Sequence, residues 1–66
     1  MLERLGYIQF RTHRVSISKD LLNDRIYCFK HTDHRCDLES FNDLELAQEY
    51  IVTPFSAGEY RLELDD

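Results

Sequence analysis

Apolar residues recur at every second position in several short segments of this chain, and at helical spacing in one stretch only. Alternation of this kind places one side of a strand in the core and the other side in solvent. It predicts a strand near the C-terminus, where Tyr60, Leu62 and Leu64 alternate with charged residues. The segments 5–10, 14–18, 25–31 and 35–39 also favour strand. The pattern therefore predicts a sheet built from short strands.

One segment, at about 42–52, has the spacing of an amphipathic helix. Asn42 is a good N-cap, and Glu45, three residues later, completes a pair that resembles a capping box. Pro54 ends the segment, because the residue before a proline avoids the helical conformation. We therefore expect a single α-helix over about 42–52.

The order of these segments defines the expected fold class. Strands come first, then the helix, then a last strand, which is typical of an α+β domain. We expect a small twisted antiparallel sheet of about four strands, with the helix packed on one face. Sixty-six residues make a single domain, 1–66, without room for a second core. A domain of this size has a net stability of only a few kcal/mol.

The charges are divided unevenly along the chain. Residues 1–36 hold seven Lys and Arg against four Asp and Glu, whereas residues 37–66 hold nine Asp and Glu and a single base, Arg61. The net charge of the whole chain is −5. An acidic balance argues against sequence-independent binding of DNA or RNA, which needs a basic footprint. Direct nucleic-acid binding is therefore not expected.

Eight carboxylates of the acidic half are candidates for a partner-binding surface. Alternate residues of a strand stand about 7 Å apart, so outward acidic residues form a row of negative charge. Such rows can complement a basic groove or imitate a nucleic-acid backbone. The alternative is that they are solvated faces that keep a small protein soluble. Whether rows from different strands merge depends on the strand order. The candidates are Asp37, Glu39, Asp43, Glu45, Glu49, Glu59, Glu63 and Asp65.

The basic half offers a second candidate surface. Interfaces favour tyrosine and arginine, and the candidates here are Tyr7, Arg11, Arg14, Tyr27 and Arg35. The alternative is that these bases neutralise the acidic half, either inside one fold or across a homodimer. A further alternative is an RNA-binding protein or a small nuclease that uses the basic N-terminal half.

Four side chains of zinc-ligand type, Cys28, His31, His34 and Cys36, lie within nine residues. All four would come from one hairpin, and neither a two-residue nor a three-residue loop brings all of them to one face. A two-residue loop instead gathers a set of side chains that would make a core face, namely Tyr27, Phe29, Cys36 and Leu38. We therefore expect no cofactor, with a zinc site on this hairpin as the alternative.

Motifs that build a catalytic site are missing from the sequence. There is no glycine-rich phosphate loop, no nucleophile elbow and no H-E-x-x-H helix. We therefore expect a protein that is not an enzyme, and we assign no catalytic residue. No apolar run approaches the roughly 18 residues that cross a membrane, so we expect no membrane partner and a cytoplasmic location in the producing or host cell.

In size, charge and lack of a catalytic motif, the chain resembles small acidic inhibitors that phages and mobile elements encode against host nucleic-acid-processing machinery. This resemblance is one of kind and implies an inhibitor or regulator. We expect a non-enzymatic protein-binding module that docks its acidic face on a basic groove of a nucleic-acid-processing protein. The alternatives are the small zinc domain and the RNA-contacting protein described above.

Overall fold

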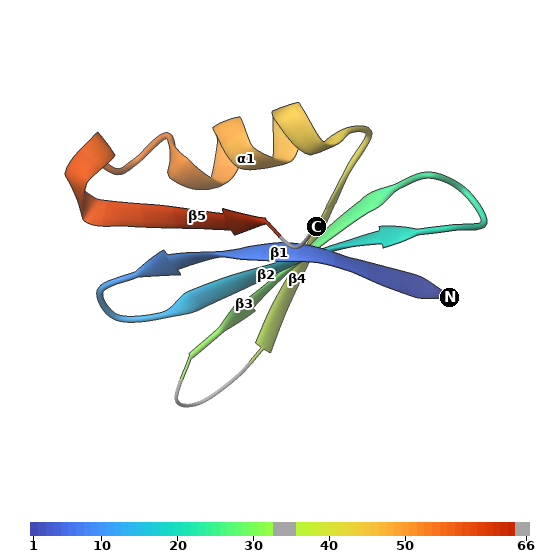
Figure 1. The fold of residues 1–66 in the computed structure, drawn as a ribbon, viewed down its shortest axis with the longest axis horizontal. Helices are drawn as coiled ribbons and strands as arrows, with labels where there is room; N and C mark the ends of the chain where they lie inside the picture. Colours follow the sequence, from blue (N-terminus) through green and yellow to red (C-terminus); the bar gives the residue numbers. More distant parts are fainter. Residues whose placement is uncertain (33–35, 65–66) are drawn as a thin grey trace.

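A five-stranded antiparallel sheet with one helix across one of its sides makes up the fold (Figure 1). The computed structural model describes residues 1–32 and 36–64. In chain order the elements are β1 (Leu2–Phe10), β2 (Arg14–Asp20), β3 (Ile26–His31), β4 (Cys36–Phe41), α1 (Leu44–Val52), the short 3-10 helix η1 (Ala57–Glu59) and β5 (Tyr60–Leu64).

The strands lie in the order β4-β3-β2-β1-β5. Consecutive strands pair from β1 to β4, and the segment with α1 then returns across the sheet, so that β5 pairs with β1 (Figure 1). The predicted α+β class is confirmed. The sheet has five strands rather than about four, and β4 and β5 form its two opposite edges.

The helix begins slightly later than predicted. Its N-cap is Asp43, whose carboxylate accepts a hydrogen bond of 2.8 Å from the backbone N–H of Leu46. The prediction of Asn42 as the cap is therefore wrong. Asn42 instead accepts a hydrogen bond from Arg25, and an aspartate at the cap also meets the positive end of the helix dipole. None of the helical segments in the described part of the chain is long and apolar enough to span a membrane.

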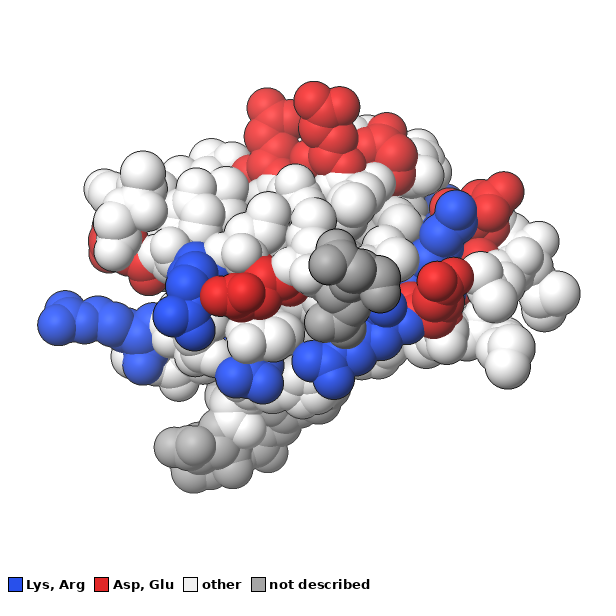
Figure 2. Space-filling model, in the orientation of Figure 1, with Lys and Arg blue, Asp and Glu red and all other residues white. Residues whose placement is uncertain are grey.

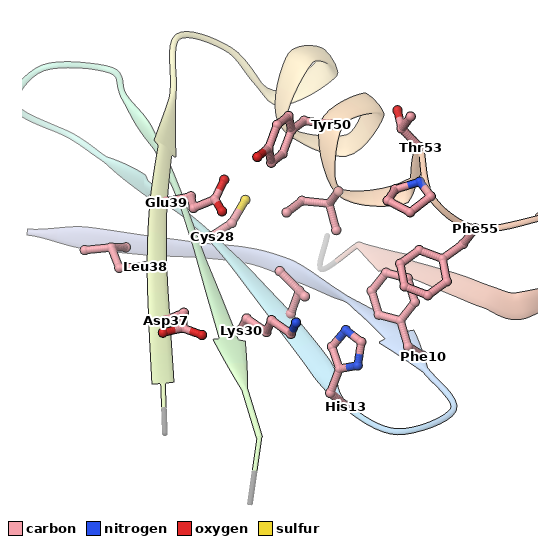
Figure 3. A pocket seen from close by; sticks show the side chains of 13 residues that line it. Phe10, His13, Cys28, Lys30, Asp37, Leu38, Glu39, Tyr50, Thr53 and Phe55 are labelled. Carbon is pink, nitrogen blue, oxygen red and sulfur yellow. The ribbon is translucent and has the colours of Figure 1, made fainter. Parts of the chain in front are cut away.

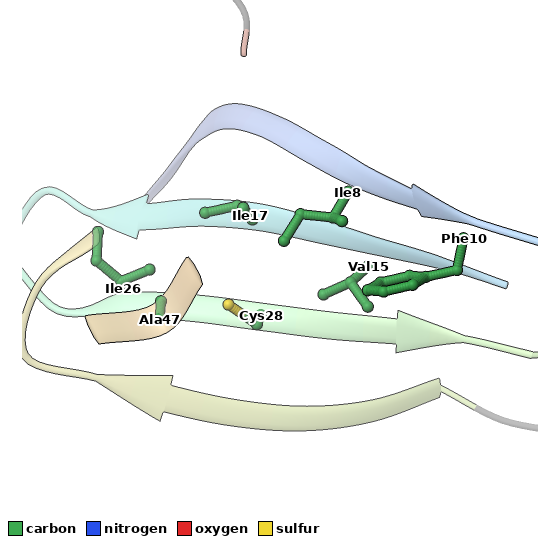
Figure 4. Packing of buried hydrophobic residues seen from close by; sticks show 7 residues of the cluster. All are labelled: Ile8, Phe10, Val15, Ile17, Ile26, Cys28 and Ala47. Carbon is green, nitrogen blue, oxygen red and sulfur yellow. The ribbon is translucent and has the colours of Figure 1, made fainter. Parts of the chain in front are cut away.

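The core lies between the sheet and α1, on one side of the sheet only (Figure 4). Strands and helix both contribute to it: its buried members are Ile8, Phe10, Val15, Ile17, Ile26, Cys28 and Ala47. We call the side of the sheet that carries this core the helix side, and the opposite side the open side. Ala47, which is fully buried, lets α1 approach the strands closely.

The pairing of β3 with β4 differs from both predicted registers. His31 lies opposite Cys36 and Cys28 lies opposite Glu39, so the loop between the strands is longer than three residues. This register leaves Tyr27, Phe29 and Leu38 on the open side, and the prediction that they form a core face is wrong. The reason is that Cys28 pairs with the buried Ile17 of β2, which places the other parity of β3 against the helix.

At Gly6 the backbones of β1 and β5 leave no room for a side chain. Its backbone has φ +151°, and a Cβ there would lie 2.7 Å from the Cα of Leu64 and against the carbonyl oxygen of Glu63. The register of β1 against β2 also shifts between Arg4 and Gly6. A glycine is therefore required for β5 to join the sheet at this point.

Candidate functional site

The pairing of the strands sorts the charged residues between the two sides of the sheet. Asp37 and Glu39 lie opposite Lys30 and Cys28 in the register, so both carboxylates project to the helix side. Glu45 and Glu49 are exposed on α1, and Asp43 caps it. Figure 2 shows a group of acidic side chains over α1 at the top of the view, and most of the visible basic side chains lower, over the strands. The helix side is therefore acidic.

We call the carboxylates of the helix side the acidic surface: Asp37, Glu39, Asp43, Glu45 and Glu49. Glu59 lies beyond the end of α1, in η1, where its carboxylate accepts a 2.7 Å hydrogen bond from the backbone N–H of Ser56. Glu63 pairs with Tyr7 in the register, on the open side, and its carboxylate lies 2.7 Å from Nε of Arg61. Asp65 lies outside the described residues. Because β4 and β5 are opposite edges, their carboxylates do not merge into one row.

The open side collects arginines and aromatic rings. The guanidinium of Arg14 lies 4.0 Å from the centre of the Tyr7 ring, and that of Arg4 lies 5.8 Å from it. Tyr27 and Phe29 follow on β3, two strands away from Tyr7. Of the candidates in the basic half, the structure thus brings together Tyr7, Arg14 and Tyr27 on one side of the sheet.

The remaining basic residues stand apart from this group. Arg11 is exposed in the turn between β1 and β2, and Arg35 lies outside the described residues. Arg25 donates hydrogen bonds of 3.0 Å to Asn42 and to Ser40, which ties the start of β3 to the end of β4. It therefore has a structural role at the edge of the sheet.

A cleft of about 760 Å³ opens on the helix side, between the end of α1 and the β3–β4 edge (Figure 3). Val15, Cys28 and Ile51 contribute apolar surface to it, and Asp37, Glu39 and Lys30 supply its charges. The remaining wall is mostly aromatic: Phe10, His13, Tyr50, Thr53, Pro54 and Phe55. Leu38 borders the cleft at the edge strand β4, although its side chain points to the open side. The cleft exists because α1 has only nine residues and leaves this part of the twisted sheet uncovered.

Three rings of the aromatic wall contact one another, two of them stacked and the third tilted. The rings of Phe10 and His13 are nearly parallel, with their centres 4.6 Å apart, and the ring of Phe55 lies 4.5 Å from that of Phe10. Burial, and secondarily the positive charge of Lys30, lower the pKa of His13 below its usual value of 6.5. The folded protein therefore favours the neutral form of the imidazole over the charged form.

The floor of the cleft holds a thiol that is chemically quiet. Burial, and secondarily the carboxylate of Glu39, raise the pKa of Cys28 to about 11. Since the thiolate is the nucleophile and the metal ligand, Cys28 is a protonated core residue at neutral pH. It packs against the buried strands as a small apolar side chain.

The four side chains of the predicted alternative zinc site are only partly placed by the structure. Cys28 points to the helix side, and His31, three residues on, lies on the open side, where its ring nitrogen Nε2 is 3.1 Å from the hydroxyl of Ser16. His34 and the side chain of Cys36 lie outside the described part. Within that part, no group of three or more potential ligand side chains is positioned to hold a metal ion.

Comparisons with models of known protein families, with curated proteins and with solved structures find no match for this chain.

Two features that the geometry provides were not predicted from the sequence. The cleft joins residues from β1, β2, β3, β4 and α1, and Phe29, His31 and Leu38 extend the open side. The alternation of Tyr27 and Phe29 was visible in the sequence, but only the register shows that it faces outward.

Proposed function

We propose that this protein is a non-enzymatic protein-binding module, an inhibitor or regulator whose acidic surface docks on a basic groove of a nucleic-acid-processing protein. The observation that carries this proposal is the separation of charge by side. The carboxylates of β4 and α1 share the helix side, whereas Arg14 and Arg61 project from the other side of the sheet. Arg14 and Arg61 therefore lie away from the acidic surface, and a base that faces it from the sheet is Lys30, opposite Asp37.

Electrostatic complementarity of this kind mainly increases the rate at which two proteins associate. A surface of one sign steers a partner of the opposite sign, and the gain in association rate falls steeply as salt increases. Like charges held together on a small domain also oppose folding, so their retention on one side favours a role beyond solubility.

The cleft supplies the apolar contact that a stable interface needs next to its charges. Tyr50, at its rim, is 58% exposed, and Leu46 on the same helix is 48% exposed. An arginine of the partner would suit this arrangement: its methylene groups would pack on Ile51 and on the exposed ring of Tyr50, and its guanidinium would meet the carboxylate of Glu39. The cleft and the acidic surface would then act as one docking site.

The test compares charge reversals on the two sides. Tagged protein is used to capture its partner from lysate of the source or host cell over a salt series, and the captured protein is identified by mass spectrometry. The same partner is then measured with Glu49→Lys, on the acidic surface, and with Glu63→Lys, which makes the same change of net charge on the open side.

We expect one protein with a basic groove to be captured, and we expect it to be released steeply by salt. Glu49→Lys should slow its association several-fold at low salt, and adding Glu45→Lys should slow it further, by roughly tenfold in total. Glu63→Lys should have a much smaller effect. Equal losses for both sides, or capture that does not depend on salt, would contradict docking through the acidic surface. Salt-sensitive self-association that Glu49→Lys removes would identify a second copy of this chain as the occupant instead.

A further inference from the structure

The open side presents flat rings and small side chains in rows across neighbouring strands. One row runs from Tyr7 through Ser16 and Phe29 to Leu38, one residue from each of four strands. The next row places Ser18 beside Tyr27 and Ser40. The small serine side chains leave space between the rings of neighbouring strands. Along β3, Phe29 and Tyr27 are about 7 Å apart. The result is a shallow platform with aromatic rings spaced over it.

Arg14 stands on this platform in a fixed position. Its Nε donates a 2.9 Å hydrogen bond to the side-chain oxygen of Gln9, and its guanidinium stacks over the ring of Tyr7. Gln9 is held in turn, because its amide donates to the backbone carbonyl of Phe10 at 2.8 Å. The two terminal nitrogens of Arg14 make no hydrogen bond within the described part of the chain. An arginine ordered in this way binds an anion with little further loss of conformational freedom.

The local charge of the platform differs from that of the whole chain. Asp37 and Glu39 project to the other side of the sheet, and Glu63 is already in contact with Arg61 at 2.7 Å. Charges farther away than about 10 Å are largely screened at physiological salt. The net charge of −5, which argues against nucleic-acid binding by the chain as a whole, therefore does not describe the field above Arg14.

We infer that the open side binds a single-stranded nucleic acid, with a phosphate group on Arg14 and bases stacked on the rings of Phe29 and Tyr27. Single-stranded nucleic acid is the ligand that combines a chain of anions with flat rings, and rings beside guanidinium groups are the usual means of binding it. An acidic peptide would match the arginines but would leave the half-buried rings of Phe29 and Tyr27 without stacking partners. This inference does not rest on the proposed docking of the acidic surface, which uses the other side of the sheet.

The inference is tested with the full chain and a fluorescently labelled oligouridine of about 12 nucleotides, a length within the range that small sheet domains cover. Binding is followed by fluorescence anisotropy between about 25 and 200 mM salt. Arg14→Gln removes the anion contact, and Phe29→Leu removes a flat ring but keeps an apolar side chain. Lys30→Gln is the matched control, because it removes one positive charge from the helix side. Circular dichroism confirms that each variant is folded.

We expect the oligonucleotide to bind at low salt and to be released as salt increases. Arg14→Gln should weaken binding and reduce the slope against salt by about one ion. Phe29→Leu should weaken it roughly tenfold and leave the slope unchanged, since stacking is not ionic. Lys30→Gln should leave both unchanged. No binding at the lowest salt, or an equal loss with Lys30→Gln, would overturn the inference. Displacement of the oligonucleotide by polyglutamate at equal charge concentration would also overturn it, because it would assign the platform to acidic protein segments.

Discussion

At the scale of single residues, Gly6 is the position where the fold depends on the absence of a side chain. Gly6→Ala should cost about 1–3 kcal/mol or more, because φ +151° is strained for alanine and its Cβ would meet the backbone of β5. The loss is measured by urea unfolding, and hydrogen exchange should show that the amides of β5 open first. Gly58→Ala is the control, because a Cβ there meets no atom within 4 Å. Equal costs for the two variants would contradict this role of Gly6.

His13 makes the stability depend on pH. Its pKa is lower in the folded protein than the usual 6.5, so the fold favours the neutral imidazole. That contribution is fully present above the unfolded pKa and is lost as the pH falls through the folded pKa. Between about pH 7.5 and pH 5 the natural protein should therefore lose more stability than His13→Phe, which keeps a ring on Phe10. Melting temperatures of the two proteins across this range check the prediction, and parallel curves would contradict it.

At the scale of elements, the start of α1 depends on Asp43. Asp43→Ala should destabilise the protein by about 1 kcal/mol, because the backbone N–H of Leu46 loses its acceptor and the helix dipole loses a negative charge. Asp43→Ser, which keeps a capping oxygen, should recover most of the loss. Chemical unfolding of the three proteins measures the difference. If Ser destabilised as much as Ala, the capping role would be wrong.

The hairpin of β3 and β4 shows the limit of local reasoning about elements. Its two strands could be predicted from their composition, but their register could not, because it depends on the length of the loop and on the pairing of Cys28 with Ile17. Phe29 lies opposite Leu38 rather than Cys36, an offset of two residues, so Tyr27, Phe29 and Leu38 still share one side as predicted. The hairpin alone does not specify which of its sides faces the helix: Cys28 pairs with the buried Ile17, so Tyr27 and Phe29, which looked like core residues, lie on the open side.

At the scale of the whole molecule, the core is small enough for one side chain to decide whether the chain folds. Ile17 is fully buried beneath α1. Ile17→Ala should cost about 2–5 kcal/mol, which is comparable to the total stability of a domain of this size. We expect circular dichroism to show a largely unfolded chain at 25 °C. Ile17→Val should cost only about 0.5–1.5 kcal/mol and stay folded. Leu22→Ala, at a side chain that is 88% exposed, should change little. A cooperative transition that persists in Ile17→Ala would contradict this view of the core.

The arrangement of the strands also determines how the charges, which are divided along the sequence, are distributed over the surface. Along the sequence the basic residues precede the acidic ones, and in the fold this division becomes a division between two sides of one sheet. The division is not complete: Lys19 and Lys30 project to the helix side, and β5, which returns to the edge beside β1, places Arg61 and Glu63 on the open side. The candidate surfaces therefore stay predictions, and the pairing of the strands decides which of their residues lie on the same side of the sheet.

By itself, the sequence determined the elements of this protein and its class. Strand alternation in 60–64 and helical spacing in 44–52 are local properties, and each was readable from neighbouring residues, whereas the N-cap was predicted one residue too early, at Asn42 instead of Asp43. The tertiary structure alone decided the order of the strands, the registers and the side on which each charge lies. These depend on contacts between residues far apart in the chain, such as Cys28 with Ile17 and Gly6 with Leu64, and no local pattern specifies them. The acidic surface, the cleft and the platform of the open side exist only at that level.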